Sequence, residues 1–471
     1  MSAAPATNLA APHTDVATIP GIVADLRRTF QSGHTKPLAW RREQLARLRA
    51  LFTENKEALQ EALARDLGKP TVEAYVTDIA VVVAEIDLVS KNLAKWTRPE
   101  KVSTPINQQP GQSKILREPL GVVLIIAPWN YPVQLLLSPL IGAIAAGNCA
   151  VLKPSEITEA TSTLLANLVP QYLDQDAIRL VEGAVPETTA LLAERFDHLF
   201  YTGNGTVGRI VMEAAAKNLT PVTLELGGKS PVIVTADCNL EVTARRIAWG
   251  KFLNTGQTCV APDYILVESA IEQAFCEKLQ AVLQEFYGEN PQASKDLGRV
   301  ANTRHHQRLM SMLEGQEILC GGQGVEEECY IAPTLVRRPD PESRVMQEEI
   351  FGPILPILPV ESVDEAIEFV NARDKPLALY VFTGSDATSE RVLGETSSGG
   401  ACVNAAIWHV ANPHLPFGGV GPSGMGSYHG RGSFETFSHR KAVVEKTTRV
   451  DPKVAYPPYT RFKEKLVTNF M

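Results

Sequence analysis

The stretch Val122-Val123-Leu124-Ile125-Ile126-Ala127 is an uninterrupted apolar run, and a helical pattern follows it as far as Ala146. A short apolar run of this kind is typical of a strand that is buried on both faces of a sheet. The same pairing of an apolar run with a helical pattern recurs three times, at 150–153 with a helix to 169, at 178–181 with a helix to 194, and at 198–201 with a helix to 217. This alternation predicts a parallel, doubly wound sheet with helices on both faces, which the run 222–226 closes.

A second unit of the same kind is expected in the later part of the chain. We place it from about Ser230 to about Gly432, and the sequence contains no internal repeats. The length of 471 residues exceeds what one hydrophobic core usually supports. We therefore predict an α/β protein with two doubly wound α/β domains.

The segments before the first apolar run are predicted to be mainly helical. Leucines recur at helical spacing over 38–67, and Gly68-Lys69-Pro70 ends the pattern. A second long helix is expected over 72–96. The stretch 101–119 is polar and contains prolines, so it does not fit the core of either neighbour and could pair elsewhere. Residues 1–20 lack the features of a secretory signal and are expected to form a disordered arm.

Composition and charge narrow the class of protein. Hydrophobic residues make up 44% of the chain, charged residues 21%, and the formal net charge is −8, which is ordinary for a globular protein and unsuited to nucleic acid. No segment approaches the roughly 20 uninterrupted apolar residues of a membrane-spanning helix. Seven scattered cysteines argue against a disulfide framework and against a zinc site. We therefore expect a cytoplasmic protein with free thiols and no metal.

Two segments carry residue types that suit covalent catalysis. Asn254-Thr255-Gly256-Gln257-Thr258-Cys259 places a cysteine behind small, polar and glycine residues, where its sulfur can reach a substrate. A cysteine is the side chain most readily ionised to a nucleophile near neutral pH, although a lone cysteine more often packs as a small hydrophobe. The stretch Thr223-Leu224-Glu225-Leu226-Gly227-Gly228 favours the catalytic interpretation of the cysteine. It places a carboxylate inside an apolar run, which costs free energy unless the carboxylate has a partner or a function. Together, Cys259 and Glu225 indicate covalent catalysis followed by hydrolysis.

These two segments resemble the active-site signatures of the aldehyde dehydrogenase superfamily. The resemblance extends to three further motifs, Pro128-Trp129-Asn130-Tyr131-Pro132, Glu348-Glu349-Ile350-Phe351-Gly352-Pro353 and Pro416-Phe417-Gly418-Gly419-Val420-Gly421. Ordered motifs spread over most of the chain make a specific match. The stretches 259–264, 426–430 and 434–440 are most similar to the class 3 branch, which includes fatty and aromatic aldehyde dehydrogenases.

The resemblance also implies a division into domains. Residues 21–100 and 120–228 would form a Rossmann-like cofactor-binding domain, and residues 229–432 a catalytic domain. In proteins of this superfamily the stretches that match 101–119 and 433–450 form a small β extension for oligomerisation, so a homodimer is expected.

The tail 451–471 resembles the region that precedes the membrane anchor of fatty aldehyde dehydrogenases. A docking helix is the favoured interpretation of this tail, with peripheral membrane contact or gating of a substrate funnel as the alternatives.

One glycine-rich segment matches the dinucleotide fingerprint. Gly203-Asn204-Gly205-Thr206-Val207-Gly208 follows a predicted strand and opens a predicted helix. Read alone, the motif would make Glu225 the ribose-binding acid, because it lies about 20 residues further on. The resemblance instead implies that Glu225 is the catalytic base and that Gly203, Asn204 and Gly208 serve the cofactor, with Gly205 incidental.

The resemblance assigns further residues to the cofactor. Lys153 and Glu156 match the pair that binds the adenine ribose, although such a pair could also be a solvated turn. Glu349 matches the residue that holds the nicotinamide ribose, with Phe351 beside it, and Trp129 either lines the junction of cofactor and substrate or is a core aromatic. Because a carboxylate at Glu156 disfavours a 2′-phosphate by charge repulsion, NAD is favoured, with NADP as the alternative.

The implied reaction is the NAD(P)-dependent oxidation of an aldehyde to the carboxylic acid. Cys259 would attack the carbonyl carbon, and the side-chain amide of Asn130 with the backbone N–H of Cys259 would stabilise the oxyanion. Glu225 would then activate water to hydrolyse the thioester. Thr258 and Val260, which flank the nucleophile, bring no arginine to pair with a substrate carboxylate, and this favours an apolar aldehyde, aliphatic or aromatic.

Two other functions remain open from the sequence. A coenzyme A-acylating aldehyde dehydrogenase would pass the acyl group to a thiol, but such relatives generally lack a base at the position of Glu225. A non-catalytic binding or structural protein on this fold is disfavoured by the intact set of Cys259, Glu225 and Asn130. His429 is either part of the active-site wall or a structural histidine, and it is left out of the predicted site.

Overall fold

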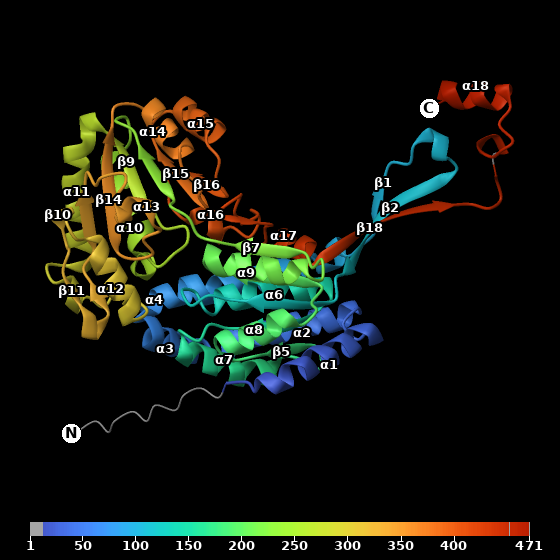
Figure 1. Ribbon diagram of the computed structural model, residues 1–471, viewed down its shortest axis with the longest axis horizontal. Coiled ribbons are helices and arrows are strands. Elements are labelled where there is room, and N and C mark those ends of the chain that lie inside the picture. The colour runs from blue at the N-terminus through green and yellow to red at the C-terminus, as the bar shows by residue number, and fades with distance from the viewer. Residues whose placement is uncertain (1–12, 452, 471) are drawn as a thin grey trace.

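The computed structural model describes residues 13–451 and 453–470, and two helix-covered sheets make up most of it (Figure 1). The first sheet has the strand order β17-β7-β6-β3-β4-β5. Its strands are β3 (Val122–Ile126), β4 (Cys149–Lys153), β5 (Ile178–Leu180), β6 (His198–Thr202), β7 (Val222–Glu225) and β17 (Gly424–Met425). The strands from β3 to β7 are parallel, and β17 is antiparallel to β7. The predicted parallel, doubly wound unit is confirmed.

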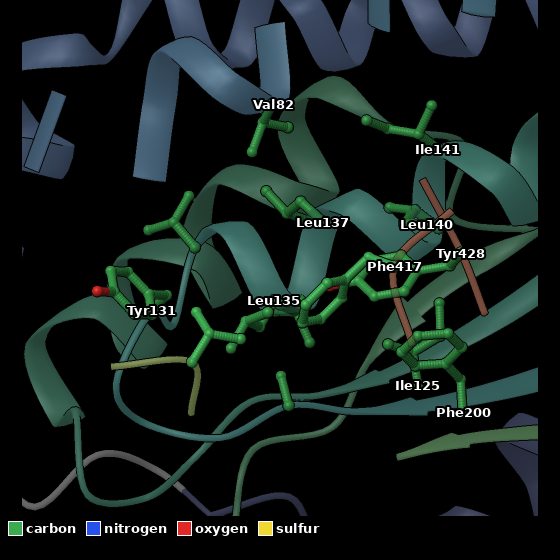
Figure 2. Close-up of a cluster of buried hydrophobic side chains, with 14 of the residues drawn as sticks. Val82, Ile125, Tyr131, Leu135, Leu137, Leu140, Ile141, Phe200, Phe417 and Tyr428 are labelled. Atoms are coloured by element: carbon green, nitrogen blue, oxygen red, sulfur yellow. The ribbon is translucent and has the colours of Figure 1, made fainter. Parts of the chain in front are cut away.

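Helices connect the parallel strands of this sheet and cover it. They are α6 (Gln134–Ala146), α7 (Glu159–Tyr172), α8 (Val185–Ala193) and α9 (Gly205–Ala216). Every residue of α6 is buried, because this helix lies between the sheet and α5 (Val81–Trp96). In Figure 2, Leu137 of α6 lies between Val82 of α5 and the side chains at the sheet, which include Ile125 and Phe200. This packing fixes the start of α6, and with it the loop that carries Asn130.

The second sheet has the strand order β10-β13-β14-β9-β8-β15-β16. Its strands are β8 (Pro231–Val234), β9 (Tyr264–Glu268), β10 (Glu317–Cys320), β13 (Thr334–Arg337), β14 (Ile354–Val360), β15 (Ala378–Phe382) and β16 (Gly400–Val403). All of them are parallel except β10, which lies antiparallel at one edge. The associated helices are α10 (Leu240–Phe252), α11 (Glu272–Tyr287), α12 (Thr303–Met312), α14 (Val363–Asn371) and α15 (Asp386–Glu395). The second predicted α/β unit is therefore also confirmed.

A three-stranded sheet projects from the body of the molecule, with α18 (Arg461–Phe470) near its far end (Figure 1). It consists of β1 (Glu100–Val102), β2 (Gly111–Pro119) and β18 (Ser438–Lys446). β18 pairs antiparallel with the whole of β2, from Ser438 opposite Pro119 to Lys446 opposite Gly111. The polar stretch 101–119 thus joins no main sheet and pairs instead with a strand far along the chain.

The predicted helices before the first sheet are interrupted in two places. The helix expected over 38–67 is two helices, α2 (Leu38–Glu54) and α3 (Lys56–Leu67), because the side chain of Asn55 donates to the Leu51 carbonyl at 3.0 Å and ends the first. The helix expected over 72–96 is α4 (Thr71–Ala74), a π-helix (Tyr75–Ala80) and α5. The spacing of the hydrophobic residues predicted neither interruption.

Three further observations qualify the predicted organisation. The expected disordered arm over 1–20 is wrong for its last part, because a 3₁₀ turn spans Val16–Thr18 and α1 (Ile19–Ser32) begins directly after it; residues 1–12 lie outside the described residues. The domain bounds stay predictions, and β17 pairs with the first sheet although it falls inside 229–432. Within the described residues, no helix has the length and apolar character needed to cross a membrane.

Candidate active site

One cavity of about 540 Å³ gathers almost all of the predicted site residues. It lies at the carboxyl ends of β3, β4, β6 and β7, where an open parallel sheet usually binds its ligand. The predicted residues that line it are Trp129, Asn130, Lys153, Glu156, Gly203, Asn204, Glu225, Cys259, Glu349 and Phe351. Gly208 lies outside the lining. The cavity also joins the two α/β units, because Cys259 and Glu349 come from the second.

The loop that carries Cys259 is held at several points. After α10 the chain turns through Asn254 and Thr255 with φ angles of 52° and 58°, a left-handed conformation that residues with a side chain seldom adopt. The Asn254 backbone N–H donates to Glu73 Oε2 at 3.0 Å. The side-chain nitrogen Nε2 of Gln257 donates to the backbone carbonyl of Arg299, in the second unit, at 2.9 Å. Beyond the cysteine, the Tyr380 hydroxyl donates to the Val260 carbonyl at 2.6 Å. These bonds hold the strained turn and fix the position of Cys259.

The surroundings of Cys259 disfavour the thiolate. The residue is half-buried in the cavity wall. Burial raises the pKa of the Cys259 thiol to about 12, and the nearby negative charges of Glu349 and Glu225 add to the effect. Because the thiolate is the nucleophilic form, attack on a substrate requires a base that removes the thiol proton.

The side-chain amide of Asn130 points towards the loop of the nucleophile. Asn130 Nδ2 donates to the Gln257 carbonyl at 3.0 Å, and the Asn130 carbonyl accepts from Asn254 Nδ2 at 2.9 Å. An amide nitrogen has two hydrogens, so one of them remains for a ligand. The residue is 2% exposed, and a donor in such a dry, fixed position is suited to a developing negative charge.

The carboxylate of Glu225 stands alone at the end of β7. The residue is 2% exposed, and neither side-chain oxygen has a hydrogen-bond partner among the described residues. Burial raises the pKa of Glu225 well above its usual value. A buried carboxyl without a partner is costly, and such groups concentrate at catalytic sites, where a raised pKa makes a stronger base.

The glycine-rich turn after β6 brings the start of α9 to the cavity. The side chain of Asn204 caps α9 by accepting from the Val207 N–H at 3.0 Å. A Cβ atom on Gly203 would lie 2.3 Å from Tyr201 Oη, and one on Gly208 would lie 2.8 Å from Leu226 Cδ2. Gly208 therefore serves the close packing of α9, while Gly203 and Asn204 form the cavity wall at a helix N-terminus that suits a pyrophosphate.

Two carboxylates, Glu156 and Glu349, line the same cavity as this helix start. Lys153 Nζ is 3.8 Å from Glu156 Oε2 and donates to the Pro154 carbonyl at 2.7 Å. Glu349 Oε1 accepts from the Gly228 N–H at 3.2 Å, and burial raises the pKa of Glu349 to about 7. Two carboxylates that can accept from ribose hydroxyls, in one cavity with a helix N-terminus that suits a phosphate, fit a dinucleotide. Lys153, Glu156, Asn204 and Glu349 would hold it.

Aromatic rings and basic residues form the wall near Glu349. The Trp129 ring lies 5.3 Å from the Phe351 ring and 5.1 Å from the His305 ring. Sequence reasoning missed His305 and, on the same helix α12, Arg304 and Arg308, which also line the cavity. The only available signal was a basic run at the start of α12, and a run of that kind usually marks a solvated face.

His429 has no place in the cavity wall. The residue is 5% exposed, and its ring stacks on Phe417 with centroids 5.4 Å apart. Burial lowers the pKa of His429 to about 4, so the ring is neutral. Leaving His429 out of the predicted site agrees with this position.

Comparisons with known proteins agree with this geometry. The model of the aldehyde dehydrogenase family matches residues 4–443. The chain is 51% identical to the mouse "Aldehyde dehydrogenase, dimeric NADP-preferring" over 94% of this chain and 98% of that one. It is also 51% identical to the mouse "Aldehyde dehydrogenase family 3 member A2", over 94% of this chain and 92% of that one.

Among solved structures, the fold is similar to one described as "Substrate bound state of Staphylococcus Aureus AldH", with a TM-score of 0.94, 47% identity and coverage of 96% of this chain and 99% of that one. These similarities confirm the predicted superfamily and its class 3 branch. The chain belongs to the aldehyde dehydrogenase family and is an NAD(P)-dependent aldehyde dehydrogenase.

Proposed function

We propose that this enzyme oxidises an apolar aldehyde with Cys259 as nucleophile, Asn130 as oxyanion donor and Glu225 as general base. The observation that carries the proposal is that these three side chains line one cavity. Lys153 and Glu349, which suit the two riboses of a dinucleotide, line the same cavity. Nucleophile, oxyanion donor, base and cofactor site therefore share one space.

The first step needs the Cys259 proton to leave. The sulfur bonds to the aldehyde carbon, and the carbonyl electron pair moves onto oxygen. With a thiol pKa of about 12, Cys259 requires a base. The ionised form of Glu225 is suited to this role, because its raised pKa brings its affinity for a proton closer to that of the thiolate. Glu225 then passes the proton to solvent before hydrolysis begins.

The second requirement is a stabilised oxyanion. One hydrogen of Asn130 Nδ2 is held by the Gln257 carbonyl at 3.0 Å, and the other is assigned to the substrate oxygen together with the backbone N–H of Cys259. A bound nicotinamide cofactor supplies the acceptor for the hydride that leaves the substrate carbon. The acyl group then remains on Cys259 as a thioester.

The last step is hydrolysis of that thioester. Glu225 takes a proton from a water molecule, and the water oxygen attacks the acyl carbon. The carbon–sulfur bond then breaks, the carboxylic acid leaves, and the Cys259 thiolate recovers its proton. A base without other hydrogen-bond partners is suited to this step, since its oxygens remain available to water.

Apolar side chains support an apolar substrate. Leu135 lines the cavity, and the Tyr131 hydroxyl is bonded to the hydroxyl of Thr258, next to the nucleophile, at 2.5 Å. Figure 2 shows that Tyr131, Leu135 and Phe417 belong to one hydrophobic cluster. Aliphatic and aromatic aldehydes are therefore the proposed substrates, with NAD favoured over NADP by the Glu156 carboxylate.

The assembly and location belong to the same proposal. The three-stranded sheet of β1, β2 and β18 projects from the body (Figure 1), which supports a role in forming a homodimer. The free cysteines support a location in the cytoplasm. Residues 21–100 and 120–228 are proposed as the cofactor-binding domain, and residues 229–432 as the catalytic domain. A mouse relative is described as dimeric. Light scattering of the purified protein tests the dimer.

The tail is proposed to be a docking helix. Tyr459 and Phe462 are 72% and 73% exposed, and α18 lies away from the body of its own chain (Figure 1). Deletion of residues 456–471 tests this proposal. Unchanged membrane association and chain-length preference would leave docking as its role.

The test of the function is NADH production with saturated aldehydes of increasing length, benzaldehyde and succinic semialdehyde, without coenzyme A. We expect turnover that rises with chain length. Turnover with succinic semialdehyde alone would overturn the substrate class. Turnover only after addition of coenzyme A would favour the acylating alternative, and no turnover under any condition would favour a non-catalytic protein.

A further inference from the structure

A buried ion pair lies directly behind the Asn130 loop. Lys69 Nζ is 2.8 Å from Asp78 Oδ2, and both side chains are 0% exposed. Lysine is almost never fully buried without a partner, and transfer of both charges out of water carries a large desolvation cost. The sequence motif around Lys69 predicts only the end of a helix, so the pair needs another explanation.

The lysine of this pair contacts the backbone of the oxyanion donor. Lys69 Nζ donates to the Asn130 carbonyl at 3.1 Å and lies 4.2 Å from the centre of the Tyr131 ring. The same carbonyl accepts from Asn254 Nδ2 at 2.9 Å, and that nitrogen also donates to the Gln257 carbonyl at 3.2 Å. Since Asn130 Nδ2 donates to the Gln257 carbonyl at 3.0 Å, the bonds form a closed ring. The ring ties the Asn130 side chain to the loop of the nucleophile.

The position of Asp78 shows how the fold supports this arrangement. Asp78 lies in the π-helix Tyr75–Ala80, a rare element that is frequent at functional sites. Its Oδ1 accepts from the backbone N–H of Gln134 at 3.3 Å, and Gln134 begins α6. Lys69 and Asp78 therefore brace both the Asn130 carbonyl and the start of the helix that follows it.

We propose that Lys69, paired with Asp78, is a positioning residue that holds the Asn130 amide in place for the substrate oxyanion. This inference rests on the role of Asn130 in the proposed function. Lys69 does not line the cavity and touches no reacting atom, so it acts only through Asn130. A charge-assisted bond fixes a carbonyl more firmly than a neutral bond does. A displacement of about 1 Å in such a group can lower the rate about 100-fold.

The test is the single-turnover rate of NADH formation in Lys69→Met, Asn130→Ala and the double variant. We expect Asn130→Ala to lower this rate about 100- to 1000-fold and Lys69→Met to lower it about 10- to 100-fold. In the Asn130→Ala background, Lys69→Met should change the rate less than about threefold, because the group that it positions is gone. NAD affinity, measured by fluorescence titration, should stay within twofold.

Two further variants separate positioning from stability. Lys69→Met leaves Asp78 buried without a counter-charge, so Lys69→Met/Asp78→Asn removes both charges and should recover much of the lost thermal stability while the rate stays low. Arg41→Met is the matched control, since Arg41 is also a buried cation, 7% exposed, that donates to a backbone carbonyl far from the cavity. It should lower the melting temperature and leave the single-turnover rate unchanged.

The outcomes distinguish this inference from the proposed function. A wild-type rate in Lys69→Met, or in the double charge-removal variant, would overturn the inference. Effects of Lys69→Met and Asn130→Ala that multiply in the double variant would also overturn it, because the two residues would then act independently. A wild-type rate in Asn130→Ala would instead overturn the oxyanion assignment itself.

Discussion

The loop that carries Cys259, the proposed nucleophile, and the side chain of Glu225, the proposed base, reach the same cavity but are held in opposite ways. Asn254, Gln257 and Asn130 make bonds to one another and to Lys69 and Glu73. Glu225 is equally buried, yet its carboxylate makes no hydrogen bond to any residue that the structure describes. A donor that must meet a developing charge benefits from fixed geometry. A base that accepts and releases protons at two steps benefits from oxygens without competing partners.

Loss of the nucleophile should give the largest effect. Cys259→Ala removes the atom that bonds to the substrate, so we expect oxidation to fall by at least about 10⁴-fold. NADH production measures the loss, and intact-mass spectrometry after aldehyde addition should detect no acyl-enzyme. Cys238→Ala, a second half-buried cysteine, serves as the control and should retain wild-type turnover. An acyl adduct that persists in Cys259→Ala would place the nucleophile elsewhere.

Loss of the base should separate the two steps of the reaction. Glu225→Gln keeps the size of the side chain but cannot accept a proton, so steady turnover should fall about 10²- to 10⁴-fold. Because Glu225 is also proposed to take the thiol proton, a stopped-flow trace should show a burst of NADH that forms more slowly than in wild type, approaches one per active site and is followed by a nearly flat line. Normal steady turnover would mean that another group activates the water.

The buried carboxyl of Glu225 should also affect how the stability of the protein changes with pH. Because folding raises the pKa of Glu225, the folded protein keeps a proton that the unfolded chain loses above about pH 4.3. Wild-type stability therefore falls as pH rises from there towards the folded pKa. Glu225→Gln removes this penalty, so its stability relative to wild type should increase from pH 5 to pH 8, by at most about 1.4 kcal/mol per pH unit.

A carboxylate whose pKa is lowered by folding, rather than raised, provides the control for that experiment. Glu272 is 3% exposed, and its bonds to Arg338 and Arg337 hold its pKa below the usual range. The contribution of Glu272 to stability is fully present above its pKa in the unfolded chain, about 4.3, and is lost only as pH falls below that value. Glu272→Gln should therefore be less stable than wild type by a constant amount between pH 5 and pH 8, and the difference should shrink below about pH 4. A stability of Glu272→Gln relative to wild type that rises from pH 5 to pH 8, as expected for Glu225→Gln, would contradict the assigned environments.

The sequence predicts the architecture well where the chemistry of a residue depends on its neighbours in the chain. The apolar run at 122–127 is a buried strand, and the motifs around Asn130, Glu225, Cys259 and Glu349 all reach one cavity. Parallel strands place their following loops at the same edge of a sheet. The topology of the first sheet therefore brings together the motifs of Asn130 and Glu225, which lie after β3 and at the end of β7. Cys259 and Glu349 instead precede β9 and β14 of the second sheet and reach the cavity from the other unit.

The supporting residues were not predictable in the same way. Lys69 follows a helix-ending glycine, and its role depends on a carboxylate and a carbonyl that fold against it from other segments. The π-helix that presents Asp78 keeps the hydrophobic spacing of a long α-helix. The break at Asn55 depends on one side-chain bond. Such features arise from tertiary contacts, which periodicity does not contain.

The smallest expected effect comes from the exposed end of the cofactor site. The Glu156 side chain is 47% exposed, so solvent screens its charge far more than that of buried Glu225. Repulsion of a 2′-phosphate at such a site is worth about 1 kcal/mol, or about fivefold in affinity. Glu156→Gln should therefore raise kcat/KM for NADP relative to NAD by about fivefold and leave kcat with NAD within twofold.

A change above about 100-fold would mean that Glu156 is desolvated when the cofactor binds, and an unchanged ratio would remove it from the adenine ribose site. The comparison between Glu156 and Glu225 thus extends to the proposed function, because a carboxylate is expected to tune cofactor choice weakly where solvent screens its charge and to affect turnover strongly where it is buried beside the proposed nucleophile.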